Sequence, residues 1–447
     1  MSAATWKGRI NSYLPWLCCW ASIVLIACTP LPAQFQNIAS TSLTILGMLT
    51  LITRQPSQRP KGTKELGKLL ICFTIPAIAS FSHSVAITST LKFVTLLTWS
   101  IFIGSALLCS FGNTKTRDWQ RSAISTIFTI WVAASCIYAT TSITIYGQFV
   151  SINPALTVFT SSLFGRILTM LMPVALWKSV KQKSTSGFAL LLASGVASML
   201  TGQRNNVLSY LIGACLLVSQ MPRKVAVRWL AACVAMLILV YPFSGELNSR
   251  TARMLATVPR PTGLVSTSER TQVAKPGTNK AEEEKTIVKH LNEISSERGY
   301  IYEAALKMTI KNPITGVGAG TFRRAFELFA TQKGRDHFGN KPPGPHNIYV
   351  SVIAQTGFIG IAGLLLAIIL LIQWHRSSRY EAWRLEEAAP YSASLFVMLF
   401  PLITQDDLYS SFWWTMFVYM ACGLLGALLL EEPGSTKGEN KSQATTN

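Results

Sequence analysis

The stretch Pro342-Pro-Gly-Pro-His-Asn-Ile-Tyr-Val350 leads directly into an apolar segment that continues to about Trp374. Proline fixes its own φ and disfavours helix in the residue before it, so a helix is expected to begin at His346 or Asn347. The unpaired N–H groups and the positive dipole end of such a helix disfavour a protonated imidazole. His346 is therefore predicted either to be a neutral proton acceptor near pH 7 or to serve only as a capping or interfacial residue.

The composition points to a membrane protein. The 447 residues are 49% hydrophobic and only 13% charged, which predicts an all-α polytopic membrane protein rather than a soluble one. The formal charge is +20, but the basic residues form short clusters between apolar segments. This pattern indicates topology and contact with lipid headgroups, not nucleic-acid binding. The nine cysteines lie in apolar segments and encode no disulfide framework or Cys-x-x-Cys metal site.

Apolar runs of about 20 residues predict twelve spans. They lie near residues 13–33, 36–53, 67–86, 91–111, 122–146, 160–180, 186–202, 205–221, 228–245, 347–373, 390–405 and 411–430. The first span is expected to be retained, because it lacks a clean signal-peptide cleavage site. The predicted organisation is spans one to nine in 1–245, an outer loop in 246–345, spans ten to twelve in 346–430 and a disordered cytoplasmic tail in 431–447.

Every second connection between the predicted spans is rich in lysine and arginine. The residues concerned are Arg54, Arg59, Lys61, Lys64, Lys115, Arg117, Arg121, Lys178, Lys181, Lys183, Arg223, Lys224, Arg228, Arg376, Arg379 and Arg384. Cytoplasmic loops carry this excess, so both termini are predicted to be cytoplasmic and residues 246–345 to lie outside. Lys92 and Arg166 break the pattern and are hypothesised to line an acceptor or lipid groove.

The outer loop is expected to contain two amphipathic helices. Residues 257–285 have the composition of a linker, and whether substrate orders them is left open. Apolar residues then recur at three- and four-residue steps over 283–311, and a glycine-rich turn leads to a second helix with Phe322, Phe326 and Phe329 inward. Because two such helices are too small to bury a core of their own, we expect them on the outer membrane surface.

Two arginines stand out beside His346. Arg204 interrupts two short apolar spans, where an arginine usually has a partner or snorkels to the interface. Arg298 lies in the first outer helix, where solvation or pairing with Glu297 or Glu303 is the ordinary outcome. Taken alone, neither residue defines a site.

Four motifs together resemble those of O-antigen ligases and related O-antigen polymerase-type proteins. They are Arg298-Gly-Tyr-Ile-Tyr302, Asn312-Pro-Ile-Thr-Gly-Val-Gly-Ala-Gly-Thr-Phe322, Pro345-His-Asn-Ile-Tyr349 and Gly357-Phe-Ile-Gly360. Their order, and one large outer loop before the tenth span, are similar to that family over about residues 200–360.

The resemblance implies a metal-independent glycosyltransferase of the GT-C class, without cofactors, in the bacterial inner membrane. It would move a finished polysaccharide from undecaprenyl diphosphate to lipid A–core, with Arg204 and Arg298 on the diphosphate and His346 activating the acceptor hydroxyl. The residue types suit these roles, because guanidinium forks bind phosphate in bidentate fashion and neutral imidazole is a general base. Attack opposite the leaving group would invert the anomeric centre.

Further candidates surround these three residues. Tyr300, Asn347 and Tyr349 are candidates for sugar binding, although interfacial tyrosines are ordinary. Arg323 and Arg324 would bind either phosphate or lipid headgroups. Asp406-Asp407 is the best metal candidate, but the outer loop holds no other aspartate than Asp336 and no Asp-x-Asp triplet. No metal site is therefore predicted, and a metal-dependent oligosaccharyltransferase is disfavoured.

Several alternatives differ in the acceptor or in the class of function. An O-antigen polymerase or a protein O-oligosaccharyltransferase would share the donor chemistry. The modest outer loop favours a glycolipid acceptor, and no obligate protein partner is indicated. An anion transporter is less well supported, because transport sites usually lie near the membrane midplane whereas these charges gather at the outer mouth.

Overall fold

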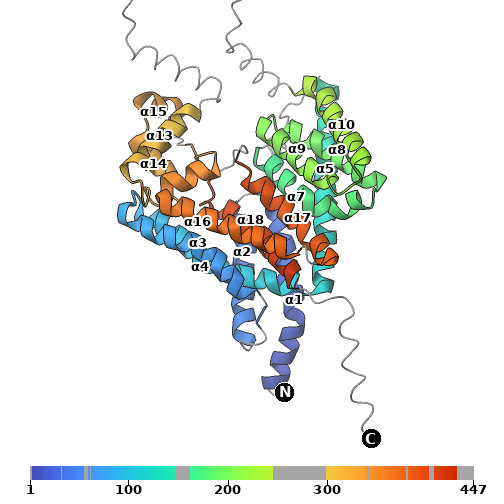
Figure 1. The fold of residues 1–447 in the computed structure, drawn as a ribbon, viewed down its shortest axis with the longest axis horizontal. Helices are drawn as coiled ribbons and strands as arrows, with labels where there is room; N and C mark the ends of the chain where they lie inside the picture. Colours follow the sequence, from blue (N-terminus) through green and yellow to red (C-terminus); the bar gives the residue numbers. More distant parts are fainter. Residues whose placement is uncertain are drawn as a thin grey trace, which may run out of the picture.

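The computed structural model describes residues 3–31, 33–54, 59–60, 62–146, 162–244, 298–339, 343–378, 381–401 and 407–429. Within these ranges the chain is helical and forms no strand (Figure 1). The predicted all-α class is confirmed. Residues 257–285, expected to be a linker, and the tail from 431 lie outside the described ranges.

Each predicted span overlaps one helix of the described chain. These helices are α1 (Ala3–Cys28), α2 (Ala33–Thr53), α3 (Thr63–Ala79), α4 (Ile87–Phe111), α5 (Thr114–Tyr146), α7 (Ser162–Lys181), α8 (Thr185–Leu200), α9 (Arg204–Val218), α10 (Arg223–Val240), α16 (Ile348–Ser378), α17 (Ala382–Leu399) and α18 (Ser411–Leu428). Two 3₁₀ turns, η2 (Ser80–His83) and η4 (Tyr241–Phe243), extend α3 and α10.

Nine of these helices, within the described residues, are long and apolar enough to cross a membrane. The other three fall short for different reasons. α8 and α9 have 16 and 15 residues, or about 24 Å at 1.5 Å per residue, less than the roughly 30 Å hydrocarbon core. α17 is long enough but carries Arg384, Glu386 and Glu387 in its first turns.

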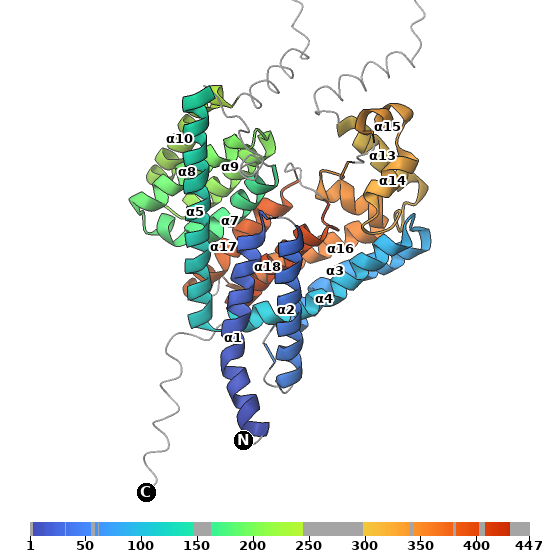
Figure 2. The same cartoon turned by 180° about the vertical axis from the view of Figure 1, so that it is seen from behind.

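The helices alternate between two ends of the bundle (Figure 2). At one end, the start of α16 is tied to the end of α17, because the Tyr349 hydroxyl donates to the carbonyl of Leu399 at 2.7 Å. We call this the α16 end. At the opposite end, the Arg121 guanidinium at the start of α5 lies 2.6 Å from the carboxylate of Glu387, near the start of α17.

The opposite end is the basic end. Lys181, which closes α7, pairs with Glu386, and Arg117 pairs with Glu387 at 3.0 Å. Gly62, before α3, lies against Leu425 near the end of α18. Arg117, Arg121 and Lys181, which belong to the basic connections, therefore lie at the end away from the start of α16. Alternating spans predict this position.

Helix α18 forms the centre of the bundle. Trp413, Trp414 and Tyr419 are among its fully buried side chains. Polar contacts fix their orientation: Trp414 Nε1 donates to Ser100 Oγ on α4 at 2.7 Å, and Gln120 Nε2 on α5 donates to the Tyr419 hydroxyl at 2.6 Å. The apolar run of α18 is therefore mainly a packing core rather than a lipid-facing surface.

Three short helices form a separate group above α3, α4 and α16 (Figure 1). They are α13 (Arg298–Lys311), α14 (Phe322–Phe329) and α15 (Gln332–Phe338). Phe322 and Phe326 are buried in a small core that also includes Met308 of α13 and Ala354 of α16. The expectation that these helices are too small to bury a core of their own is therefore wrong, because α13, α14 and the loop between them supply most of this cluster. α16 adds Ala354 to it.

Candidate functional site

His346 lies in a tight turn at the α16 end. Its φ is +52°, in the left-handed region that residues other than glycine seldom adopt. Pro345 before it is buried. The next residue, Asn347, caps α16, because its Oδ1 accepts hydrogen bonds from the backbone N–H of Tyr349 at 2.9 Å and of Val350 at 3.2 Å.

The helix therefore begins at Ile348, later than the predicted start at His346 or Asn347. A left-handed residue cannot be part of a right-handed helix, and Asn347 is occupied as the cap. Asn347 Nδ2 also donates to the carbonyl of Pro401 at 3.0 Å. Asn347 and Tyr349, predicted as sugar-binding candidates, thus make contacts that fix α16 against the end of α17.

Helix α16 is broken at Gly357, where φ is +63° and ψ is −157°. The loop after α13 forms hydrogen bonds with backbone groups of α16 on both sides of this break. The carbonyl of Pro313 accepts from Phe358 N at 2.8 Å, and Val317 N donates to the carbonyl of Ala354 at 3.1 Å. The glycine-rich turn is therefore a docking element for α16.

Close backbone approach explains the glycines at this joint. A Cβ on Gly316 would lie 2.3 Å from the carbonyl carbon of Gln355, and one on Gly357 would lie 2.4 Å from that of Ile314. Both glycines also have positive φ. Only residues without a side chain allow these two backbones to pair.

A polar network extends from the break toward α18. Gln355 is fully buried, and its Oε1 accepts from Thr321 N at 3.0 Å while its Nε2 donates to the Asp407 carboxylate at 2.9 Å. The Ser351 hydroxyl donates to the same carboxylate. The network thus joins the docking loop, α16 and the turn before α18.

Tyr409 closes this network on the other side of the break. Its hydroxyl lies 2.6 Å from Thr356 Oγ1. Burial raises the pKa of the Tyr409 hydroxyl, so it stays protonated and keeps its hydrogen bond. Sequence reasoning missed this network, although a glutamine two residues before a glycine in an apolar run was a usable signal.

Asp407, part of the best predicted metal candidate, is held by these protein donors, and Asp406 lies outside the described residues. Among the residues that the structure describes, no three His, Cys, Asp or Glu side chains are grouped as metal ligands.

Arg298 and Tyr300 lie at the start of α13, beside α15. The Tyr300 ring stacks on the His337 ring with centroids 5.9 Å apart. Arg298 is half-buried. In the sequence, α15 directly precedes the segment that carries His346. The contact between Tyr300 and His337 therefore places the start of α13 beside the helix that leads to His346.

Arg204 is the first residue of α9, after the turn that begins at Thr201. The predicted polar break between two short apolar helices is thus confirmed. Asn206 Nδ2 donates to Thr201 Oγ1 at 2.8 Å, and a Cβ on Gly165 of α7 would lie 2.4 Å from that same nitrogen. Arg166, next along α7, is 6% exposed. The fold therefore brings a second arginine beside the turn of Arg204.

Three weaker candidates lie on the surface. Arg323 and Arg324 are exposed on α14, and Arg324 Nη1 donates to Thr88 Oγ1 at the start of α4 at 3.5 Å. Lys92 is exposed on α4. Their positions are compatible with contacts to headgroups rather than with a closed site.

Arg204, Arg298 and His346 lie on three different parts of the fold: Arg204 begins α9, Arg298 begins α13, and His346 lies just before α16. In both views α9 belongs to the helix group on one side of α16–α18, and α13 to the group on the other side (Figures 1 and 2). The turn of His346 belongs to the helices between these groups, because it is bonded to α16 and to Pro401.

These features define a class, an all-α polytopic membrane protein. Residues 188–365 match the family described as O-antigen ligase. The comparison with curated proteins gives no match. The match supports membership of the O-antigen ligase superfamily, whose members are glycosyltransferase-like enzymes of lipopolysaccharide synthesis. The resemblance carried by the four motifs is confirmed, and the matched region contains Arg204, Arg298 and His346.

Proposed function

We propose that this protein is an O-antigen ligase that transfers finished O-antigen polysaccharide from undecaprenyl diphosphate to lipid A–core. The observation that carries the proposal is the family match over residues 188–365. That region runs from α8 into α16 and contains every residue for which we propose a chemical role. A polymerase and a protein O-oligosaccharyltransferase share the donor chemistry and differ in the acceptor.

His346 is the proposed general base. The acceptor hydroxyl attacks the anomeric carbon of the donor sugar while its proton passes to the neutral imidazole. The bond between that carbon and the diphosphate oxygen breaks, and undecaprenyl diphosphate leaves with the electron pair. Attack from the opposite face inverts the configuration. The left-handed backbone of His346 supports the assignment, since such strain is often kept at functional positions.

Arg204 and Arg298 are the proposed ligands of the diphosphate. Their guanidinium groups are always charged and offer bidentate hydrogen bonds to phosphate oxygens. Arg204 is the first residue of α9, and the positive dipole end of a helix also favours an anion. The leaving group gains charge as the bond breaks, so donors on it lower the barrier without a metal.

The proposed location is the bacterial inner membrane, with the α16 end facing the periplasm. The basic connections lie at the other end, and cytoplasmic loops carry such an excess of lysine and arginine. Undecaprenyl diphosphate and membrane lipids are the proposed lipid partners.

Complementation of a ligase-deficient Gram-negative strain that makes compatible lipid-linked O-antigen tests the function. Wild-type protein should restore the lipopolysaccharide ladder on a gel, and His346→Ala should not. His375→Ala is the matched control, because His375 lies near the other end of α16 and bonds Ser392. If wild type made no ladder even with its native polysaccharide and core, the ligase assignment would be wrong.

A further inference from the structure

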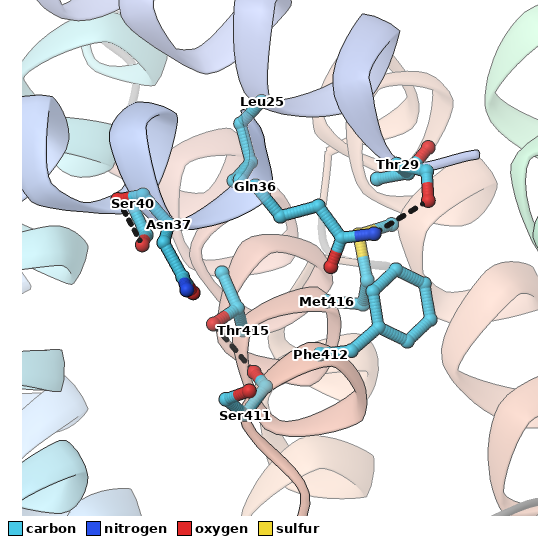
Figure 3. A pocket seen from close by; sticks show the side chains of 9 residues that line it. All are labelled: Leu25, Thr29, Gln36, Asn37, Ser40, Ser411, Phe412, Thr415 and Met416. Carbon is cyan, nitrogen blue, oxygen red and sulfur yellow. Dashed lines mark hydrogen bonds between the residues drawn. The ribbon is translucent and has the colours of Figure 1, made fainter. Parts of the chain in front are cut away.

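A small pocket opens at the α16 end, between the α1–α2 turn and the first turn of α18 (Figure 3). Six of its lining residues are polar and uncharged: Thr29, Gln36, Asn37, Ser40, Ser411 and Thr415. The other lining residues are Leu25, Phe412 and Met416, so no charged side chain of the described part of the chain lines the pocket. The lining therefore offers hydrogen bonds to a neutral ligand. It carries no net charge that would attract an anion or a cation.

The Gln36 amide is held in a fixed position. Gln36 Nε2 donates to the carbonyls of Thr29 at 2.8 Å and Leu31 at 3.0 Å, which leaves its Oε1 as an acceptor. The amides of Gln36 and Asn37 reach from α2 toward the first turn of α18 (Figure 3). Asn37 and Ser411 are exposed, so an entering ligand meets both.

The size of the pocket limits what enters it. Its cavity volume is about 20 Å³, and a single water needs about 10–15 Å³ measured in this way. A hydroxyl or hydroxymethyl group fits, whereas a whole sugar ring must remain at the mouth. Phe412 is half-buried in the lining and offers an aromatic surface there.

The pocket is tied to the candidate site through a short turn. Ser410 caps α18, and its backbone N–H donates to the carbonyl of Asp407 at 2.9 Å. The Asp407 carboxylate accepts from Ser351 and Gln355 of α16. These bonds fix the position of Ser411, which forms one wall of the pocket, relative to α16, the helix that begins beside His346.

We propose that this pocket is a saccharide subsite that receives the hydroxyl-bearing edge of one neutral sugar while the reacting bond lies at His346. Amides, hydroxyls and one aromatic ring, without charge, match the chemistry of such a sugar. The inference rests on the proposed function. The sugar belongs either to the donor polysaccharide or to the acceptor core, which present the same chemistry.

Direct binding of sugars tests the subsite without turnover. The full chain in lipid nanodiscs is titrated with either lipid-free O-antigen oligosaccharide or lipid-free core oligosaccharide, and saturation-transfer NMR measures binding. Wild type should bind one of them. Asn37→Ala and Ser411→Ala should each weaken it about 3- to 10-fold, as expected for one lost hydrogen bond, and Asn37→Trp should abolish it by filling the pocket.

Ser42→Ala is the control, because Ser42 is on α2 but donates to the carbonyl of Ile38 in its own helix. Binding of the O-antigen oligosaccharide alone would assign the sugar to the donor, and binding of the core alone to the acceptor. No binding by wild type, or equal binding by Asn37→Trp and Ser42→Ala, would overturn the subsite. Failure of the ligase assignment appears separately, as a missing ladder in the complementation experiment.

Discussion

His346 combines a strained backbone with a position at the start of a helix. Asn347 takes the capping role that the sequence left open for His346, so the imidazole is not needed to cap α16. That distinction favours chemistry over structure at this residue. Gln355 is the opposite case, since its side chain amide joins Thr321 and Asp407 and has a clear structural role.

Arginine geometry can be tested apart from arginine charge. Arg204→Lys and Arg298→Lys each keep the positive charge but remove the bidentate fork. Each should lower kcat by about a hundredfold or more, because one lost donor to transition-state charge commonly costs about 3–4 kcal/mol. The assay is transfer by purified protein at saturating substrates.

Arg223→Lys is the control for these variants, because Arg223 is exposed at the start of α10 and should tolerate the change. Full activity in both Arg204→Lys and Arg298→Lys would contradict the proposed binding of the diphosphate, since a simple positive charge would then suffice.

At the scale of elements, the break in α16 organises the α16 end. Two backbones pair there: the loop over residues 313–318 bonds the carbonyls before Gly357 and the N–H groups after it. A helix interrupted in this way must satisfy four backbone groups, and the loop supplies partners for them. The short-helix group is thereby attached to the bundle by hydrogen bonds as well as by the packing of Met308 and Phe326.

Gly357→Ala should disrupt this joint. The new Cβ meets the backbone of Ile314 at 2.4 Å, and the left-handed conformation adds about 1–3 kcal/mol of strain. The apparent Tm of the protein in detergent should fall by several degrees, measured by the loss of the monodisperse size-exclusion peak after heating.

Gly67→Ala is the matched control, because Gly67 lies within α3 and a Cβ there meets nothing within 4 Å. It should be neutral or slightly stabilising, as expected for alanine in a helix. An equal Tm for the two variants would show that the α16 joint adds little to stability.

At the scale of the whole molecule, charge and contacts divide the bundle into two unlike ends. The basic end is stabilised by Arg117 and Arg121 around Glu387, and the α16 end carries the candidate site and the pocket. This polarity is the basis for the proposed orientation.

Reporter fusions test the orientation. Alkaline phosphatase fused after Gly339, next to the short helices, should be active because it would fold in the periplasm. Green fluorescent protein fused after Asn113, between α4 and α5, should fluoresce because it would remain in the cytoplasm. Exchanging the reporters is the control, and the reverse pattern of activity would contradict the proposed orientation.

The sequence by itself determined the long helices and their alternation. Apolar length and the clustering of basic residues are local properties, so they can be read along the chain. The motifs around Arg298 and His346 were equally local, and they identified the superfamily. The start of α16 was predicted within two residues and was missed because an asparagine side chain, rather than periodicity, sets it.

Only the tertiary structure decided how the α16 end is built. The partners of Gln355 lie at residues 321, 351 and 407, and the pocket joins α2 to α18, so no local pattern encodes either. The short-helix core was mispredicted because α13 and α14 pack on each other across the glycine-rich loop, which periodicity within either helix does not reveal. Hydrogen bonds and packing between residues far apart in sequence depend on which surfaces meet, and that is settled only when the chain folds.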